Sequence, residues 1–379
     1  MNATSTTNHR DDIVILGGAR TPIGRIMGAL APLSAPALGA VAVRAAVERA
    51  GVDPAAVDEV LMGQVVQAGS GQAPARQAAI HGGLPSHVSA TTINKVCGSG
   101  LKTVMMAASA IRAGDGEIFV AGGMESMSQA PFLIPNMRGG HKFGNTQLVD
   151  ANVQDGLWCS FEHWMMGEAG EVVAEAFEVT REQMDRFALE SHHKAVRATE
   201  EGAFEAEIVP VVIESRKGTT TVTRDEGPRS DTSLEALAKL PPAFREGGRI
   251  TAGNAPGLND GAAAVVVTRR AQAEALGLQP LARAMPVVLD RAGWSLDDVD
   301  LIELNEAFAA QVLANGRDME QQGYDWDWSK VNVNGGAVAL GPPVGCSGAR
   351  VLVTLLYALQ QRGLRRGLAA LCLGGGEAV

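Results

Sequence analysis

Apolar and polar positions along this chain follow the patterns of strands and helices that succeed one another in turn. Residues 13–18 form an apolar run typical of a buried strand. Residues 43–52 have the periodicity of an amphipathic helix that ends in a glycine, and a short β-run follows at 57–62. A further apolar helix is expected from about residue 101 to 112, followed by a strand. This order predicts an α/β protein.

The same order of elements recurs near the other end of the chain. Ala50 and Val57 correspond to Ala292 and Val299 at one constant offset, which predicts a second amphipathic helix at 287–293 and a β-run at 299–304. In each copy a turn with Cys and Gly, an apolar helix and a β-run ending in glycines come next, IFVAGG at 118–123 and LAALCLGGG at 368–376. The repeat predicts two related α/β halves in layered packing.

A region of different character separates these halves. It contains a Gly-rich polar loop at 137–144, a charged helix at 181–198 and a short strand pair at 208–213 and 219–223. We expect the helix, which contains His192 and His193, to be solvated. The predicted domains are an N-terminal half at 1–128 that is completed by about 259–279, an inserted α+β loop domain at 129–258, and a C-terminal half at 280–379.

Composition and charge exclude several classes of function. The formal net charge of −10 and the low aromatic content of 4% argue against a nucleic-acid partner. Residues 1–12 lack the apolar core of a signal peptide, and no apolar run reaches membrane length, so no membrane partner is expected. The cysteines have neither metal nor disulfide spacing, which predicts a reducing, cytoplasmic setting and no metal site; they are Cys97, Cys159, Cys346 and Cys372.

The candidate nucleophile is Cys97. Residues 94–102 read NKVCGSGLK and place this cysteine where the helix at 101–112 begins. Unpaired N–H groups and the positive end of the helix dipole are expected to favour a thiolate there, and a nucleophilic thiolate indicates acyl transfer. A buried structural cysteine is the alternative that this motif leaves open.

Other chemical interpretations of the glycine-rich turns fit less well. Residues 345–348 read GCSG, one residue short of the G-x-S-x-G elbow of serine hydrolases, and no histidine follows them. Residues 17–20 read GGAR and lack the G-x-G-x-x-G spacing of a dinucleotide site.

A set of motifs spread over nearly the whole chain resembles the thiolase family, the acetyl-CoA C-acyltransferases. They are GGARTPIG at 17–24, NKVCGSGLK at 94–102, GGMESMS at 122–128, TAGNAPGLNDG at 251–261, NEAFA at 305–309, NGGAVALG at 334–341 and CLGGG at 372–376. The resemblance implies the thiolase fold, two layered halves (αβαβα) with an inserted loop domain.

The resemblance also implies a two-step acyl transfer. Cys97 would attack an acyl-CoA, and Cys372 would remove a proton from the methyl group of acetyl-CoA so that the enolate attacks the acyl group. In the reverse direction this is thiolysis of a 3-ketoacyl-CoA. The main-chain N–H groups of Cys97 and Gly374 would hold the oxyanion, and Asn305 would hold a water at the enolate site.

One substitution departs from the family's pattern. The family's Gly-His-Pro turn reads GPP at 341–343, so Pro342 stands in place of the active-site histidine. Proline has no side-chain nitrogen, and general-base assistance is typically worth about 10²–10⁴-fold. We therefore expect impaired activity. The alternative is a catalytically inactive homologue that binds acyl-CoA or acts as a scaffold.

The C-terminal half is also expected to be shortened. Only LARAMP at 281–286 precedes the second helix, where comparison of the two copies indicates that about twenty residues are absent. The sequence stops at GEAV, residues 376–379, within the family's last strand. Because sheet hydrogen bonds would be lost, we expect the C-terminal half to be less stable than the N-terminal half.

The resemblance also implies coenzyme A contacts and a mode of assembly. Arg229 aligns with a residue near the nucleotide and Met166 with the pantetheine tunnel, while Ala252, Ala307 and Phe308 would form apolar walls. Met165 and Pro256 replace a histidine and a serine of the family. Acyl-CoA thioesters would be substrates, with no tightly bound cofactor. The loop at 138–150 resembles one that joins dimers into tetramers, so a homodimer or homotetramer is expected.

Overall fold

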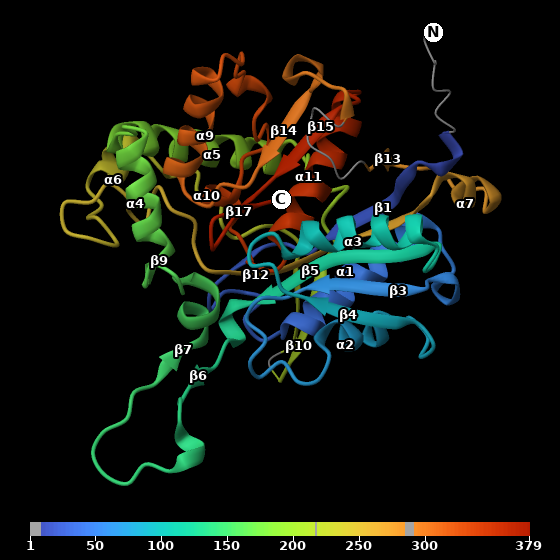
Figure 1. Cartoon of the computed structure of the whole chain (residues 1–379), viewed down its shortest axis with the longest axis horizontal. Coiled ribbons are helices and arrows are strands. Elements are labelled where there is room, and N and C mark those ends of the chain that lie inside the picture. The colour runs from blue at the N-terminus through green and yellow to red at the C-terminus, as the bar shows by residue number, and fades with distance from the viewer. Residues whose placement is uncertain (1–8, 217, 285–291) are drawn as a thin grey trace.

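The structure, a computed structural model, describes residues 9–216, 218–284 and 292–379. A seven-stranded mixed sheet in the order β13–β1–β12–β5–β3–β4, with β2 beside β12, organises the first half (Figure 1). Its strands are β1 (Ile13–Arg20), β2 (Gly24–Arg25), β3 (Glu59–Gly63), β4 (Ser89–Ile93), β5 (Ile118–Ser126), β12 (Asn259–Arg269) and β13 (Ala282–Arg283). The strand β12 follows the middle region in sequence and lies between β1 and β5, antiparallel to both.

Helices cover both faces of this sheet. On one face lie α1 (Ala35–Ala50) and α2 (Pro74–His81), and on the other α3 (Ser99–Ala113) and α11 (Ser347–Arg362). The helix α1 begins where Ser34 accepts a hydrogen bond from the N–H of Ala37, and it ends at Gly51, whose φ of 67° needs glycine. The strands and helices predicted at 13–18, 43–52, 57–62 and 101–112 are therefore confirmed.

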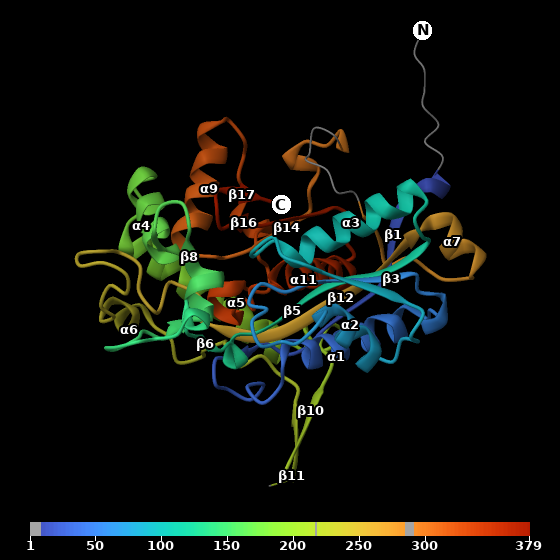
Figure 2. The ribbon, with the colours of Figure 1, turned by 60° about the horizontal axis from the view of Figure 1, so that its bottom comes forward.

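The second half continues the layers. The strand β14 (Leu301–Leu304) is parallel to β15 (Gly367–Ala370), as predicted for 299–304. On one face Leu301 packs with Leu355 of α11, and on the other Ile302 packs with Val312 of α9 (Ala309–Gln321). The layers thus run from α1 and α2 through the large sheet, α3 with α11, and β14–β15 to α9 (Figure 2). This is the expected layered α/β fold; most of the helix predicted at 287–293 lies outside the described residues.

The middle region adds helices and two hairpins. Its helices are α4 (Met166–Ala176), α5 (Arg181–Glu200) and α6 (Leu234–Ala238). The hairpin of β10 (Val211–Ser215) and β11 (Gly218–Val222) confirms the predicted strand pair, and it projects from the body in Figure 2. A second projection in Figure 1 is the arm at 132–150, whose base is β6 (Phe132–Leu133) paired with β7 (Val149–Asp150).

The remaining elements are short. They are β8 (Trp158–Cys159), β9 (Trp164–Met165), α7 (Arg270–Ala275), α10 (Ala337–Leu340), β16 (Cys372–Leu373) and β17 (Glu377–Ala378). Within the described ranges, no helix is long and apolar enough to cross a membrane.

Candidate active site

The loop that carries Cys97 is held in a fixed turn. Val96 has a φ of 47°, and its N–H donates to Oδ1 of Asn94 over 3.0 Å. The hydroxyl of Ser99 accepts from the N–H of Lys95 over 2.8 Å and donates to the carbonyl of Val96 over 2.6 Å. The helix α3 begins at Ser99, so Cys97 lies at the helix start as the sequence predicted.

The thiolate expected at Cys97 stays a prediction, and burial of the thiol opposes it. Burial raises the pKa of the thiol to about 11, and the nearby carboxylate of Glu125 raises it further. The main-chain N–H groups of Cys97 and Gly374 donate toward the sulfur and oppose this shift, but desolvation is the larger effect. The sequence pattern places the sulfur at a helix dipole and contains no information about how deeply other segments bury it.

A second cysteine lies beside the first. Cys372 begins the hairpin of β16 and β17, and its pKa is raised to about 12 by burial and then by the charge of Cys97. A Cβ atom placed on Gly374 would lie 3.3 Å from Cγ1 of Val96 and 3.7 Å from Sδ of Met166. The structure therefore brings Cys97, Cys372, Gly374 and Met166 together.

Asn305 lies at the end of β14, next to the same hairpin. Its N–H donates to the carbonyl of Ala370 over 3.0 Å, two residues before Cys372. The side chain is 1% exposed, and its Oδ1 atom has no hydrogen-bond partner among the described residues. A buried acceptor of this kind is a position for a water or a substrate donor.

Ala307 and Phe308 follow Asn305 in the chain. The N–H of Ala307 donates to the carbonyl of Asn305 over 3.0 Å. The ring of Phe308 packs edge-to-face on Phe244, with ring centroids 6.1 Å apart, and it contacts α4 near Gly170. Both residues are partly buried. Their role as an apolar wall of the site stays a prediction.

The loop that contains Pro342 borders the nucleophile. Val344 shares an apolar cluster with Cys97, and the N–H of Gly345 donates to the buried carboxylate of Glu125 over 2.9 Å. The same carboxylate accepts from the N–H groups of Val65 and Val66 over 3.0 and 3.3 Å. Pro342 lies two residues before Val344 in this loop and supplies no titratable group.

Sequence reasoning assigned no role to Glu125. Burial raises the pKa of its carboxyl to about 7, although three main-chain N–H groups oppose the shift. A signal was present in the sequence, since Glu125 is an acidic residue within the apolar run of β5, where every residue is buried. Such a residue needs fixed hydrogen-bond partners and so marks a contact between segments.

The middle-region histidine differs from expectation. His192 is 6% exposed, and its Nδ1 accepts a hydrogen bond from the N–H of Arg229 over 3.2 Å. Burial lowers the pKa of His192 to about 4, and the positive charges of Arg229 and Arg25 lower it further. The predicted solvation was therefore wrong for His192, which contacts the segment of Arg229, whereas His193 is exposed as expected.

Two expected substrate contacts lie at the surface. The side chain of Arg229 is 57% exposed and pairs with Asp231 at 3.4 Å. Ala252 is also exposed. Their placement at a coenzyme A site stays a prediction.

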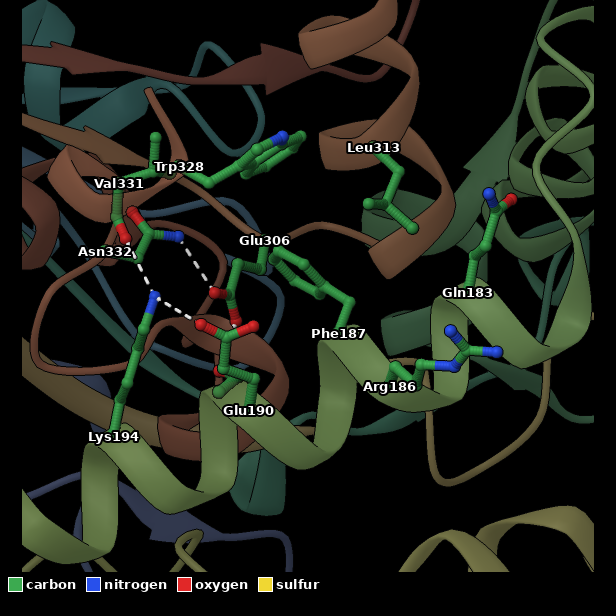
Figure 3. Close-up of a pocket in the computed structure, with 11 residues that line it drawn as sticks. Gln183, Arg186, Phe187, Glu190, Lys194, Glu306, Leu313, Trp328, Val331 and Asn332 are labelled. Carbon is green, nitrogen blue, oxygen red and sulfur yellow. Dashed lines mark hydrogen bonds and ion pairs between the residues drawn. The ribbon is translucent and has the colours of Figure 1, made fainter. Parts of the chain in front are cut away.

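A separate cavity of about 250 Å³ lies between α5 and the segment that follows Asn305 (Figure 3). Its polar floor is the carboxylate of Glu306, which accepts from Ser191, Asn332 and the N–H of Val338 over 2.8, 2.8 and 2.9 Å. Phe187 and Trp328 form an edge-to-face wall. Neither Cys97 nor Cys372 lines this cavity, so we do not place the reaction there. Its hydrogen bonds hold Glu306, the residue after Asn305. No cluster of three or more metal-binding side chains occurs in the described part of the chain.

Comparisons with known proteins agree with this arrangement. The family model for the thiolase N-terminal domain matches residues 13–271, and that for the C-terminal domain matches residues 261–379. Acetyl-CoA acetyltransferases of Pseudomonas aeruginosa and Cupriavidus necator are each 51% identical to the chain over 389 aligned positions, covering 97% of this chain and 98% of the relative. The alignments are longer than the 379 residues of the chain, so these relatives have segments without a counterpart here.

Solved structures give the same result. The acetyl-CoA acetyltransferase of Syntrophomonas wolfei superposes with a TM-score of 0.94 at 43% identity, covering 97% of this chain and 98% of the other. That of Bacillus anthracis gives 0.93 at 41% identity, covering 98% of both chains. With two matching domain models, the cysteine pair and the layered halves in agreement, the chain belongs to the thiolase family.

Proposed function

We propose that this protein is an acetyl-CoA acetyltransferase that works through an acyl-enzyme on Cys97. The observation that carries the proposal is the convergence of Cys97, Cys372 and the N–H of Gly374 at one point. The names of its relatives support acetyl-CoA as the substrate. Coenzyme A thioesters enter as substrates, and no tightly bound cofactor is needed for the chemistry.

In the first step the Cys97 sulfur attacks the thioester carbonyl and coenzyme A leaves. The N–H groups of Cys97 and Gly374, which point toward the sulfur in the free site, are placed to receive the carbonyl oxygen as negative charge develops on it. Because burial raises the pKa of Cys97 to about 11, the thiol must lose its proton as the attack proceeds.

In the second step Cys372 is the candidate base. Its thiolate would remove a proton from the methyl group of a second acetyl-CoA, and the resulting enolate would attack the acetyl group on Cys97. Asn305 is the candidate that holds a water against the enolate oxygen, since its carboxamide is buried beside this hairpin with one acceptor free. The reverse sequence cleaves a 3-ketoacyl-CoA.

Pro342 is the reason to propose a slow enzyme. It occupies the position that holds a histidine in the family, and the charged neighbour that most affects Cys97 is the acidic Glu125, whose lone pairs are already engaged by N–H groups. Proton removal from Cys97 then falls to solvent or coenzyme A. An inactive acyl-CoA-binding or scaffolding protein is the second candidate, and the same substitution favours it.

The acyl-CoA would reach the cysteines past Met166. This residue lies against Gly374, and the wall of Phe308 and Ala307 lies on the side of Asn305. Arg229 and Ala252, both exposed, are the proposed contacts of the nucleotide end.

The arm at 132–150 supports self-association. Its exposed apolar side chains include Phe132, Phe143 and Leu148, which are 63%, 97% and 62% exposed. Large apolar side chains gathered on a projecting hairpin mark a protein contact. We propose that the arm joins copies of this chain into a homodimer or homotetramer.

A thiolysis assay tests the proposed activity. The purified protein is given acetoacetyl-CoA and coenzyme A, and acetyl-CoA formation is followed beside the Cys97→Ala and Cys346→Ala variants. We expect slow turnover in the parent and in Cys346→Ala and none in Cys97→Ala. Equal rates in all three would exclude Cys97 as the nucleophile, and no turnover with no acyl-enzyme would favour the binding protein.

A further inference from the structure

The hairpin that carries Cys372 and Gly374 is joined to the nucleophile loop by an ion pair between two side chains. The ammonium of Lys95, two residues before Cys97, forms an ion pair with the carboxylate of Glu377 in β17. Among the described residues, this is the one ion pair, and the one hydrogen bond between two side chains, that joins residues 371–379 to the rest of the protein; the N–H of Gly374 also donates to the sulfur of Cys97.

The other contacts between these segments are apolar and close. A Cβ atom on Gly98 would lie 2.6 Å from Cδ2 of Leu373 and 2.7 Å from Cγ2 of Val379, so a larger residue at position 98 would displace these side chains. Within the hairpin, Leu371 and Val379 exchange two main-chain hydrogen bonds of 2.8 and 3.0 Å. The hairpin's main-chain pairing is therefore internal and does not involve the nucleophile loop.

The position of this unit matters for the chemistry. Its Gly374 N–H reaches the sulfur of Cys97, and its Cys372 lies close enough for the two sulfurs to affect one another. Non-directional apolar contacts alone would permit small displacements, whereas an ion pair fixes the register of Glu377 against Lys95. Displacement of an oxyanion donor by a fraction of its bond length lowers the rate of acyl transfer.

We propose that Lys95 and Glu377 are positioning residues whose ion pair, here called the latch, holds the Cys372 hairpin in register with the nucleophile loop. This inference rests on the proposed acyl transfer. The latch is accessible to water, since the two side chains are 26% and 59% exposed. Its strength must therefore fall as salt concentration rises.

The test compares Lys95→Met, Glu377→Gln and the charge-reversed pair Lys95→Glu with Glu377→Lys. Two rates are measured at low and high salt: alkylation of Cys97 by iodoacetamide, located by peptide mass spectrometry, and acetylation of Cys97 by acetyl-CoA. Glu274→Gln, which removes the exposed ion pair with Arg10, is the matched control. Thermal unfolding of each variant checks that it is folded.

A loosened hairpin exposes the sulfur and displaces the Gly374 N–H, so the two rates change in opposite directions. We expect alkylation to be about two- to fivefold faster and acetylation about two- to fivefold slower in each single variant, with both rates restored in the charge-reversed pair. High salt should have the same effect on the parent and little on the single variants.

The latch is overturned if the single variants have the same alkylation and acetylation rates as Glu274→Gln. It is also overturned if the charge-reversed pair does not bring these rates back toward those of the parent. If the parent forms no acetyl-enzyme, the proposed function fails, and the alkylation rates alone still decide whether the latch exists.

Discussion

The main-chain N–H of Gly345 donates to Oε2 of Glu125 over 2.9 Å, although the two residues are 220 positions apart. This hydrogen bond fixes the loop of Pro342 against the strand β5 of the first half. A Cβ atom on the neighbouring Gly123 would lie 2.1 Å from the carbonyl oxygen of Gly345, so the two segments are in direct contact. The acidic group that holds this loop is also the charge that raises the pKa of Cys97.

Alkylation of Cys97 should therefore report the charge on Glu125. The pKa of about 11 lies above that of a free thiol, so the reactive thiolate is scarce at neutral pH and increases about tenfold per pH unit until pH 11. Glu125→Gln removes a negative charge, and we expect the pH profile to move to lower pH. Iodoacetamide rates from pH 7 to 11 measure both profiles.

Cys346→Ala is the control for that experiment, because Cys346 is a buried thiol whose pKa is also raised by burial, to about 12. Its loss should leave the Cys97 profile in place. A Cys97 profile with a midpoint near neutral pH in the parent, or a Glu125→Gln profile moved to higher pH, contradicts the electrostatic account.

If the proposed acyl transfer is correct, placing an imidazole at position 342 should accelerate it. Pro342→His returns a general base to the loop beside Cys97, and we expect thiolysis to increase about 10²-fold or more. The assay is acetyl-CoA formation from acetoacetyl-CoA and coenzyme A. Pro342→Ala, which removes the proline ring without adding a base, should show no comparable increase in the thiolysis rate.

Equal rates for Pro342→His and Pro342→Ala would mean that the loop does not present its side chain to the sulfur. A parent rate already as high as that of Pro342→His would mean that another group performs the proton transfer.

The buried carboxylate of Glu306 should be important for stability. Its three hydrogen-bond donors come from Ser191 of α5, Asn332 and the N–H of Val338, so it joins the middle region to the C-terminal half. Glu306→Ala leaves buried donors without acceptors, which costs about 1–3 kcal/mol for each such group. Urea unfolding should show a loss of at least about 2 kcal/mol.

Glu190→Ala is the matched control, since Glu190 lines the same cavity with a side chain that is 65% exposed. Its effect should stay below about 1 kcal/mol. Similar losses of unfolding free energy for the two variants would show that the hydrogen bonds of Glu306 stabilise the protein no more than an exposed charge does.

Assembly should depend on the arm at 132–150. Phe143 is 97% exposed and belongs to the segment that connects β6 to β7. The substitution Phe143→Ser therefore removes apolar surface from the arm and leaves the core unchanged. We expect sedimentation velocity to show a smaller species than the parent. Val212→Ser, on the other projecting hairpin and 57% exposed, should leave the parent's size unchanged, and a parent that is already monomeric would exclude the assembly.

Local patterns were sufficient for much of the fold. The strand β1 and the helices α1 and α3 follow from apolar periodicity and glycine ends, which depend on neighbouring residues only. The repeat likewise predicted β14. The segment at 285–291, where the second helix was expected, lies outside the described residues.

The site required contacts that no local pattern contains. The motif at 94–102 named Cys97, and the resemblance named Cys372 and Asn305. The ionisation of Cys97 depends on its burial and on the N–H of Gly374, more than 270 residues away. His192 was expected to be solvated because its own helix is charged, and it is buried by the segment around Arg229. The pairing of Lys95 with Glu377 could not be read from either sequence neighbourhood.

The claim on which the rest depends is that the sulfur of Cys97 accepts an acetyl group although Pro342 stands where the resemblance places the active-site histidine. Mass spectrometry of the intact protein after incubation with acetyl-CoA, followed by peptide mapping, tests it most directly. The account predicts one acetyl group per chain on the peptide that contains Cys97, absent from Cys97→Ala. An unmodified protein after prolonged incubation, or acetylation that persists in Cys97→Ala, would contradict it.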